Sequence, residues 1–313
     1  MPIQEDNLIN KFGLVLEPIS PKIWVGGENS PLKPQVINPS GSWLNDLVLS
    51  EYQDSSFACV SFSALSILEI IEKKITGRED NWSDKALLNM SGTVPKVGNT
   101  LYAVAQTITN RGYVRESMYP FKEPYFTTTP SEIIESCKMN AGKWNYQFIH
   151  RSQWQEALKS SPLQICIAFS QTIDEHGRYY STKDAGINHA VCLLEINQSS
   201  NYVTNGSYVV YDSFPPYVKI IRWDTNVYEY AVQFIPKIKE NNMEIPNNTL
   251  LQLVESPGGF GLFLDNQIII DDLAKVLASW MVRNGGKIEK MTLPVKNDVW
   301  TAHPHIDLKG KSL

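Results

Sequence analysis

The sequence predicts an α+β fold in which a helical lobe is followed by an antiparallel β lobe, and two patterns support this prediction. Between residue 57 and about residue 160, apolar residues recur at helical spacing in segments that begin at Ser or Thr and end near Gly. From residue 163 to residue 235, short β-branched and aromatic runs are separated by Pro, Gly, Asn and Asp, which is typical of strands. We therefore expect the helices to come first and the strands to follow.

The strongest helix prediction covers Phe57–Ile75, where apolar residues occupy nearly every face. A helix of that kind runs through a core rather than lying on its surface. Four shorter helices and five strands complete the expected elements. The helices are expected at residues 83–90, 100–111, 131–138 and 152–159, and the strands at residues 163–169, 190–196, 208–211, 218–223 and 231–235.

The domain organisation follows from shifts in composition along the chain. Residues 1–45 are rich in Pro, Gly and Asn and predict an extended N-terminal arm. Residues 46–240 form the expected main domain, with the helical lobe extending to about residue 160 and the β lobe from residue 161 to 240. A small appendage of strands (250–255, 260–265, 268–270) and one helix (273–283) is expected within residues 241–285, and residues 286–313 are expected to be a tail.

The composition is that of an ordinary globular protein. Of 313 residues, 42% are hydrophobic and 19% are charged, and 28 basic against 33 acidic residues give a net charge of −5. This mild acidity argues against nucleic acid as a partner. The start of the sequence lacks a secretory signal, and no apolar run reaches the ~18 residues that span a bilayer, so we expect no membrane contact and a cytoplasmic location. Four cysteines are too few for a dense disulfide framework.

One of these cysteines lies in a setting that favours reactivity. Cys59 falls in the first turn of the predicted buried helix, where unpaired N–H groups and the helix dipole lower the pKa of a thiol. His189, at the start of a predicted strand, is the candidate base, and Asp212, at the end of the next strand, is the candidate orienting group. The Cys-to-His separation of 130 residues matches the spacing of a known peptidase class. The other three cysteines (Cys137, Cys166 and Cys192) are interpreted as packing residues.

With these residues in order, the chain resembles the papain-like cysteine peptidases between about residues 45 and 235. The likeness implies the papain-like two-lobe fold, a Cys59 nucleophile, a His189 base and an oxyanion hole formed with Gln53. It also implies that Asp212 stands where the family has Asn, and that Gly98, Asn99 and Asn188 contact substrate. Among these peptidases, the chain is most similar to divergent members from tailed bacteriophages. The matching segments are Gln53, Cys59-Val-Ser-Phe-Ser-Ala64, Gly98-Asn99, Met118-Tyr-Pro120, Asn188-His-Ala-Val191 and Asp212-Ser213-Phe214.

Several positions depart from the pattern of that family. The usual Cys-Gly-Ser-Cys-Trp is here Ser56-Phe57-Ala58-Cys59-Val60, so one disulfide of the secreted members has no counterpart. Asp212 places a carboxylate where a neutral amide is usual. Because 58 residues precede Cys59, we do not expect zymogen control by a long propeptide.

These observations predict a cysteine endopeptidase that works through a Cys59 thiolate, a His189 imidazolium and an acyl-enzyme, with no cofactor and no metal. The expected substrate is a protein or a peptide, for which murein peptides are one candidate. An alternative is that the chain is a structural or docking component of a virus particle, in which the site is vestigial or is used only during maturation. The C-terminal appendage would then make the assembly contact, and the protein would be located in the virion. Transglutaminase or amidase chemistry on the same residues is a third hypothesis.

Overall fold

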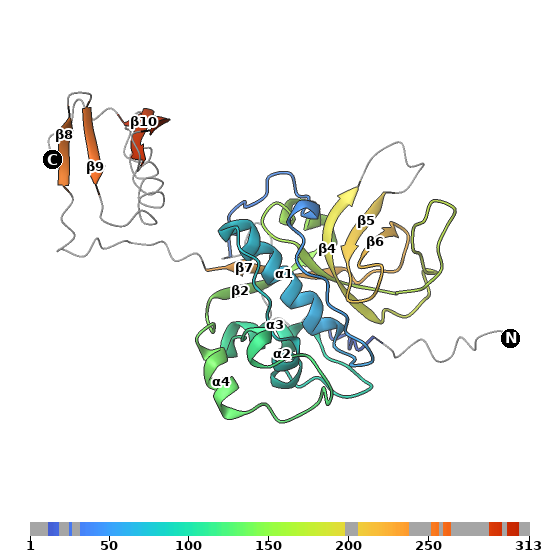
Figure 1. The fold of residues 1–313 in the computed structure, drawn as a ribbon. Helices are drawn as coiled ribbons and strands as arrows, with labels where there is room; N and C mark the ends of the chain where they lie inside the picture. Colours follow the sequence, from blue (N-terminus) through green and yellow to red (C-terminus); the bar gives the residue numbers. More distant parts are fainter. Residues whose placement is uncertain are drawn as a thin grey trace. The chain divides into compact units, whose positions relative to one another are not determined.

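The protein is described from a computed structural model. It describes residues 12–18, 25–26, 32–197 and 206–237 with their side chains, and the backbone of residues 252–256, 259–263, 288–295 and 299–306. The chain divides into two compact units, residues 1–238 and residues 239–313 (Figure 1). The first unit holds every candidate site residue.

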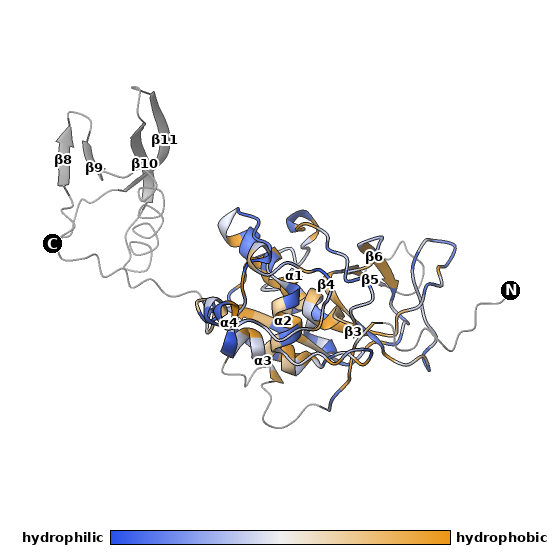
Figure 2. Cartoon of the chain, turned by 60° about the horizontal axis from the view of Figure 1, so that its bottom comes forward, coloured by the Kyte–Doolittle hydropathy of each residue, from blue (hydrophilic) through white to orange (hydrophobic). Residues whose placement is uncertain are grey.

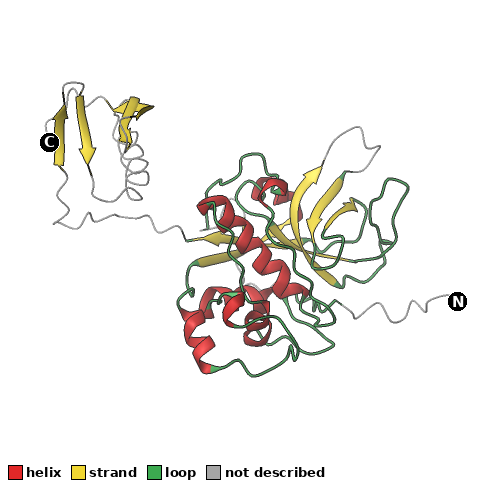
Figure 3. Ribbon diagram, viewed as in Figure 1, coloured by secondary structure: helices red, strands yellow, loops and turns green. Residues whose placement is uncertain are grey.

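The first four described α-helices of the first unit lie together, whereas a short helical segment lies apart from them beside the strands, as Figure 3 shows. Among the helices that the structure describes, none combines the length and the apolar character that a bilayer crossing requires. The α-helices are α1 (Cys59–Thr76), α2 (Asp84–Met90), α3 (Leu101–Arg111), α4 (Ser131–Lys138) and α5 (Trp154–Ala157), and short 3-10 turns are η2 (Leu44–Asp46), η3 (Glu116–Met118) and η4 (Arg151–Gln153).

Helix α1 is the buried helix that the sequence predicts. Of the thirteen residues from Cys59 to Ile71, all except Ser66 are buried. The helix ends at Gly77, whose positive φ of 71° allows its N–H to bond back to the Lys73 carbonyl. It packs against β3 and β4 of the sheet and against α2 and α3. Figure 2 shows apolar residues concentrated on these elements.

A seven-stranded sheet forms the other side of the unit, in the order β1-β2-β7-β3-β4-β5-β6. All neighbouring strands pair antiparallel except β1 and β2, which are parallel. The five predicted strands correspond to β3–β7, and the α+β class is confirmed. The strands are β1 (Val25–Gly26), β2 (Trp144–His150), β3 (Leu163–Ile167), β4 (His189–Asn197), β5 (Ser207–Tyr211), β6 (Val218–Arg222) and β7 (Tyr230–Pro236).

The strand β2 was not predicted, because residues up to about 160 were assigned to the helical lobe. It pairs with β7 along its full length. The signal was present, since Trp144, Tyr146 and Phe148 alternate with polar residues at the period of a strand. The helix expected at 152–159 is also shorter, because η4 occupies its start and only the single turn of α5 follows.

In the described part of the second unit, two pairs of antiparallel strands occur. The first joins β8 (Gln252–Ser256) to β9 (Gly259–Phe263), where strands were expected. The second joins β10 (Ile288–Val295) to β11 (Val299–Ile306), so the segment expected to be a tail contains two strands. The strands β10 and β11 were not predicted because their sequence lacks a strong apolar pattern. Two strands joined by a short connection can nevertheless pair through their backbones. The expected strand at 268–270 and helix at 273–283 lie outside the described residues.

A group of buried carboxyls connects the helical elements of the first unit. Asp84 of α2 is 1% exposed, and among the described residues neither of its carboxylate oxygens has a hydrogen-bond partner. Burial raises the pKa of Asp84, and the nearby carboxyls of Glu51, Glu69 and Glu116 raise it further. Burial likewise raises the pKa of Glu116 to about 7, against the opposing charge of Lys85. Asp84 and its neighbour Glu51 are both acidic, and two adjacent carboxyls favour sharing one proton over ionising together.

We expect the carboxyls with raised pKa values to contribute most to the stability of the first unit in acid. An unfolded carboxyl titrates near pH ~4, so between that pH and the raised folded pKa values the folded state binds more protons than the unfolded state. This contribution to stability is complete below pH ~4 and is lost as the pH rises through the pKa of Glu116 at about 7. The Tm is measured at a mildly acidic and at a mildly alkaline pH. The difference between these two Tm values should be smaller for Asp84→Asn than for the native chain.

The matched control is Asp46→Asn, which removes an aspartate that pairs with Lys74 at the surface. Its difference in Tm between the two pH values should equal that of the native chain. An equal difference in all three proteins would mean that Asp84 is ionised in the folded state, contrary to the prediction.

Candidate active site

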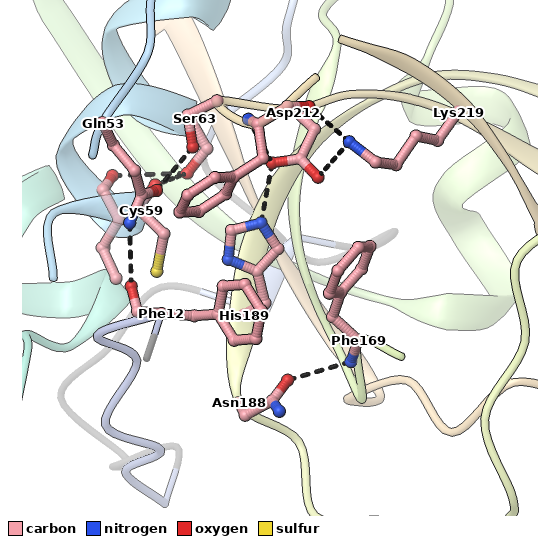
Figure 4. A network of polar contacts seen from close by, with 12 residues as sticks. Phe12, Gln53, Cys59, Ser63, Phe169, Asn188, His189, Asp212 and Lys219 are labelled. Carbon is pink, nitrogen blue, oxygen red and sulfur yellow. Dashed lines mark hydrogen bonds and ion pairs between the residues drawn. The ribbon is translucent and has the colours of Figure 1, made fainter. Parts of the chain in front are cut away.

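The starts of two elements bring Cys59 and His189 together. Cys59 is the first residue of α1 and His189 is the first residue of β4, against which α1 packs. Both residues are fully buried. The Cys59 sulfur points toward the edge of the imidazole that carries Nδ1 (Figure 4), and Nδ1 has no hydrogen-bond partner among the described residues. No hydrogen bond joins the thiol to Nδ1 in this form, but the imidazole presents its unpaired nitrogen on the side of the thiol.

The first turn of α1 is held from two sides. Ser63 Oγ donates a hydrogen bond to the Cys59 carbonyl (2.7 Å), and Gln164 Nε2 of β3 donates one to the Val60 carbonyl (2.7 Å). The N-cap residue Ala58 provides no side-chain cap, and the N–H groups of Ser61 and Phe62 donate to its carbonyl. Only the N–H groups of Cys59 and Val60 therefore lack a backbone carbonyl partner in the helix. Phe57 has a φ of 57°, in the left-handed region that favours glycine, and glycine is the residue that the family pattern has here.

Asp212 orients the imidazole from the opposite edge. Its Oδ1 lies 2.7 Å from His189 Nε2 and also accepts a hydrogen bond from the Phe214 N–H (3.2 Å). Its Oδ2 forms an ion pair with Lys219 Nζ at 2.8 Å. Burial alone raises the pKa of the Asp212 carboxyl, but the adjacent His189 and Lys219 outweigh burial and hold that pKa below its usual value. Asp212 is therefore held as a carboxylate.

The side-chain amide of Gln53 has a defined orientation. Its Oε1 accepts a hydrogen bond from Ser213 Oγ (2.5 Å), and its backbone N–H bonds to the Ser213 carbonyl (3.2 Å). Because the oxygen is occupied by a hydroxyl donor, the NH₂ group faces the other way. There Nε2 donates to the carbonyl oxygen of Phe12 (3.3 Å). Ser213 thus fixes which end of the amide is presented as a donor.

Gly98 and Asn99 hold a segment of the N-terminal arm. The Asn99 N–H donates to the Gly13 carbonyl (2.9 Å), and the Val15 N–H donates to the Asn99 carbonyl (2.8 Å), so that Leu14 and Asn99 form a parallel bridge. A Cβ on Gly98 would lie 1.8 Å from the Gly13 carbonyl oxygen. The two backbones can approach this closely only because residue 98 is glycine.

The side chain of Phe12 covers the imidazole. Its ring centroid lies 4.6 Å from that of His189, and Phe169 (5.2 Å) and Phe214 (5.6 Å) present their rings edge-on to it. Phe12 is only 6% exposed. The arm was expected to be extended, but nothing in the sequence indicated that it would contact the site. Residues 12–15 occupy the space between the base, the Gln53 amide and the Gly98-Asn99 turn, which is where a bound peptide is expected.

Asn188, expected to contact substrate, is placed beside the base. Its side-chain oxygen accepts a hydrogen bond from the Phe169 N–H (2.9 Å), and the Phe169 ring packs against His189 at 5.5 Å between centroids. Its recorded contact therefore supports the aromatic surroundings of the imidazole. No group of three or more His, Cys, Asp or Glu side chains suited to a metal ion occurs in the part of the chain that is described.

The pKa of the Cys59 thiol is shifted in the direction opposite to the one that the sequence predicted. Burial raises its pKa above the ordinary value and Asp212 adds to the rise, although backbone N–H groups at Ala190 and Val60 lower it. The helix-terminal effect is present, but exclusion of water outweighs it in this arm-bound form. All four cysteines are free thiols, and burial raises the pKa of Cys137 to about 11.

Comparisons with known proteins identify the fold. No protein-family model and no curated protein sequence matches the chain. Solved structures do match it. The digestive procathepsin L2 proteinase from the larval midgut of Tenebrio molitor aligns with a TM-score of 0.56 at 13% identity, over 75% of this chain and 80% of that one. A recombinant stem bromelain precursor gives 0.54 at 17% identity, over 75% and 80%.

The fold is papain-like. A third match, the digestive procathepsin L 3 of Tenebrio molitor larval midgut, gives a TM-score of 0.53 at 14% identity, over 72% of this chain and 77% of that one. Sequence motifs alone had predicted this papain-like architecture. Three contacting residues were not assigned to the site from sequence, namely Phe12, Ser213 and Lys219. For Lys219 the sequence contained no signal, because apolar residues lie on both faces of its strand and the burial pattern of β6 is known only from the structure.

We expect Gly13→Ala to expose the thiol. A Cβ at this position would lie 1.9 Å from the Phe57 carbonyl oxygen, and the φ of 90° is unfavourable for alanine, so the arm must leave its place. Alkylation of Cys59 by iodoacetamide, followed by peptide mass spectrometry, should then be at least ~10-fold faster than in the native chain.

The control is Leu16→Ala in the same arm, because Leu16 is 41% exposed. Its alkylation rate should match that of the native chain. Equal rates for Gly13→Ala and the native chain would show that residues 12–15 do not protect the thiol.

Proposed function

We propose that this chain is a cysteine endopeptidase with Cys59 as the nucleophile and His189 as the general base and acid. The observation that supports this most strongly is the geometry of the imidazole. Nε2 is bonded to Asp212 at 2.7 Å, while Nδ1 has no partner among the described residues and faces the Cys59 thiol (Figure 4). A base held in one tautomer by a carboxylate and directed at a thiol is the arrangement that acyl transfer needs.

In the proposed mechanism, His189 Nδ1 takes the proton of the Cys59 thiol, and the thiolate attacks the carbonyl carbon of a peptide bond. The developing oxyanion accepts hydrogen bonds from Gln53 Nε2 and from the Cys59 N–H. The imidazolium then gives its proton to the leaving amine as the C–N bond breaks. Water, deprotonated by the same imidazole, attacks the thioester and releases the acid product, which restores the thiol.

The arm indicates what kind of ligand the site accepts. The backbone of Asn99 bonds to an extended segment that passes close to Gly98, and an apolar side chain fits beside the imidazole, between Phe169 and Phe214. We therefore propose that Gly98 and Asn99 hold the backbone of a peptide substrate. The arm and a substrate cannot occupy this space together, so residues 12–15 must move before turnover. We propose that the arm acts as a short propeptide-like segment, a role that the expectation about a long propeptide did not address.

Our assignment of the chain to a subclass of peptidases rests on sequence motifs. The Asn188-His-Ala-Val191 and Asp212-Ser213-Phe214 segments support a divergent bacteriophage-type peptidase. That origin would place the protein in the host cytoplasm or in the virion, with murein peptides as candidate substrates. Digestion of casein and of purified murein separates these substrate classes.

The proposal predicts that Cys59→Ala abolishes peptide cleavage. A peptide library is digested by the Gly13→Ala chain, with and without Cys59→Ala, and the products are identified by mass spectrometry. Loss of the nucleophile should reduce the cleavage rate by at least ~10³-fold. Cys137→Ala, which removes a thiol of the surface helix α4, should leave the rate unchanged. Equal cleavage with and without Cys59 would refute the proposal.

A second prediction concerns the oxyanion donor. Ser213→Ala removes the hydroxyl that holds Gln53 Oε1, so the amide can rotate and present its oxygen to the oxyanion. We expect kcat to fall by about 10-fold, less than the ~10²–10³-fold loss on removing such a donor. The alkylation rate of Cys59 should stay unchanged, because Ser213 does not touch the thiol–imidazole pair. A parallel loss of alkylation would contradict this separation of roles.

A further inference from the structure

A lysine is buried directly behind the candidate base. Lys219 lies on β6, and its side chain is only 1% exposed. Its ammonium has three oxygen partners, which are Asp212 Oδ2 at 2.8 Å, the Pro216 carbonyl at 2.7 Å and the Phe214 carbonyl. Two of these contacts are hydrogen bonds to carbonyl oxygens, and the third is an ion pair with the carboxylate. Burial lowers the pKa of the Lys219 ammonium below its ordinary value, and the adjacent Asp212 opposes that shift. The contacts hold the ammonium at a defined point.

The position is an unusual one for a charge. On β6 the outward residues Val218 and Ile220 are apolar and about 40% exposed, whereas Lys219 points inward beside the buried Ile221. Lysine is almost never fully buried unless it is paired. An apolar residue would fill this inward position without desolvating a charge, so the ammonium group itself has to be explained.

The ion pair divides the two oxygens of Asp212 between two partners. Oδ1 faces His189 Nε2, and Oδ2 faces Lys219. Rotation of the carboxylate would break both contacts, so the oxygen that orients the imidazole is fixed in place. The rings of Phe169 and Tyr179 lie 5.6 Å and 5.9 Å from Lys219 Nζ and help to keep this space free of water.

The pair also sets the charge that the imidazole experiences. Around His189, the titratable or charged groups of the described residues are Cys59 from α1, Asp212 after β5 and, behind Asp212, Lys219 from β6. A buried carboxylate alone would stabilise the imidazolium strongly and make it a poor proton donor to the leaving amine. The lysine offsets that charge, so that the aspartate–lysine pair is neutral in sum, as an asparagine would be.

We propose that Lys219 is a positioning residue of the candidate active site, which orients the Asp212 carboxylate toward His189 and offsets its negative charge. This proposal rests on the proposed function for its catalytic consequence, but its electrostatic part concerns only the imidazole. Asp212 and Lys219 then act together, because the cation offsets the charge that distinguishes an aspartate from an asparagine.

The test compares Lys219→Met with the double variant Asp212→Asn/Lys219→Met. In the single variant the carboxylate is uncompensated, so the NMR titration midpoint of the His189 ring, assigned with a His189→Gln sample, should rise by about one pH unit. The alkaline limb of the pH profile of kcat/KM should move up with it, and kcat should fall. The double variant restores neutrality and should bring the midpoint back to the native value or below it.

Three further proteins make the result decisive. Lys138→Met, at an exposed lysine of α4 that pairs with Glu135, should leave the His189 midpoint unchanged. Lys219→Arg keeps the charge and should stay closer to the native midpoint than Lys219→Met. If Lys219→Met does not fold, Asp212→Asn and the double variant give the same comparison without an unpaired carboxylate, and loss of Lys219 should again raise the midpoint.

The proposal is overturned if the His189 midpoint does not change on loss of Lys219, either with the native Asp212 or with Asp212→Asn. Lys219 would then have only a structural role, in holding the turn at residues 214–216. The NMR titration does not depend on turnover. A chain that cleaves no peptide but shows the shift therefore refutes the peptidase function and retains the electrostatic role of Lys219.

Discussion

The hydrogen bond between His189 Nε2 and Asp212 Oδ1 is the contact on which the candidate site depends. It fixes the imidazole so that Nδ1 is directed at the first residue of α1, and it does so without solvent, because both side chains are completely buried. A buried carboxylate would normally take up a proton. The lysine behind it and the imidazole before it keep it ionised, so three elements (β4, β5 and β6) combine to direct one ring nitrogen.

The exclusion of water also makes the Cys59 thiol harder to ionise. In the arm-bound form burial raises the pKa of the Cys59 thiol, and the N–H groups at the start of α1 only partly offset it. Phe12 covers the imidazole, and its carbonyl accepts the Gln53 donor that the proposed chemistry would need. The described structure is thus a closed state of the site. In this state the groups of the candidate site are assembled while residues 12–15 of the arm cover them.

The fold was largely predictable because its signals are local. The all-round apolar pattern of residues 57–75 predicted α1, and β-branched runs predicted β3–β7. The strand β2 was missed although Trp144, Tyr146 and Phe148 alternate, because the surrounding segments favoured helix. At the site, the order and spacing of Cys59, His189 and Asp212 singled out residues that the structure does bring together. Their catalytic roles stay a proposal.

The sequence by itself determined which residues could do chemistry, since a thiol at a helix start and a histidine at a strand start are set by neighbouring residues. Only the tertiary structure decided what surrounds them. Whether Lys219 faces solvent or Asp212 depends on which face of β6 the sheet turns inward, and Phe12 reaches His189 across 177 positions of the chain. Such contacts follow from how elements pack in space, and no period or spacing along the chain records them.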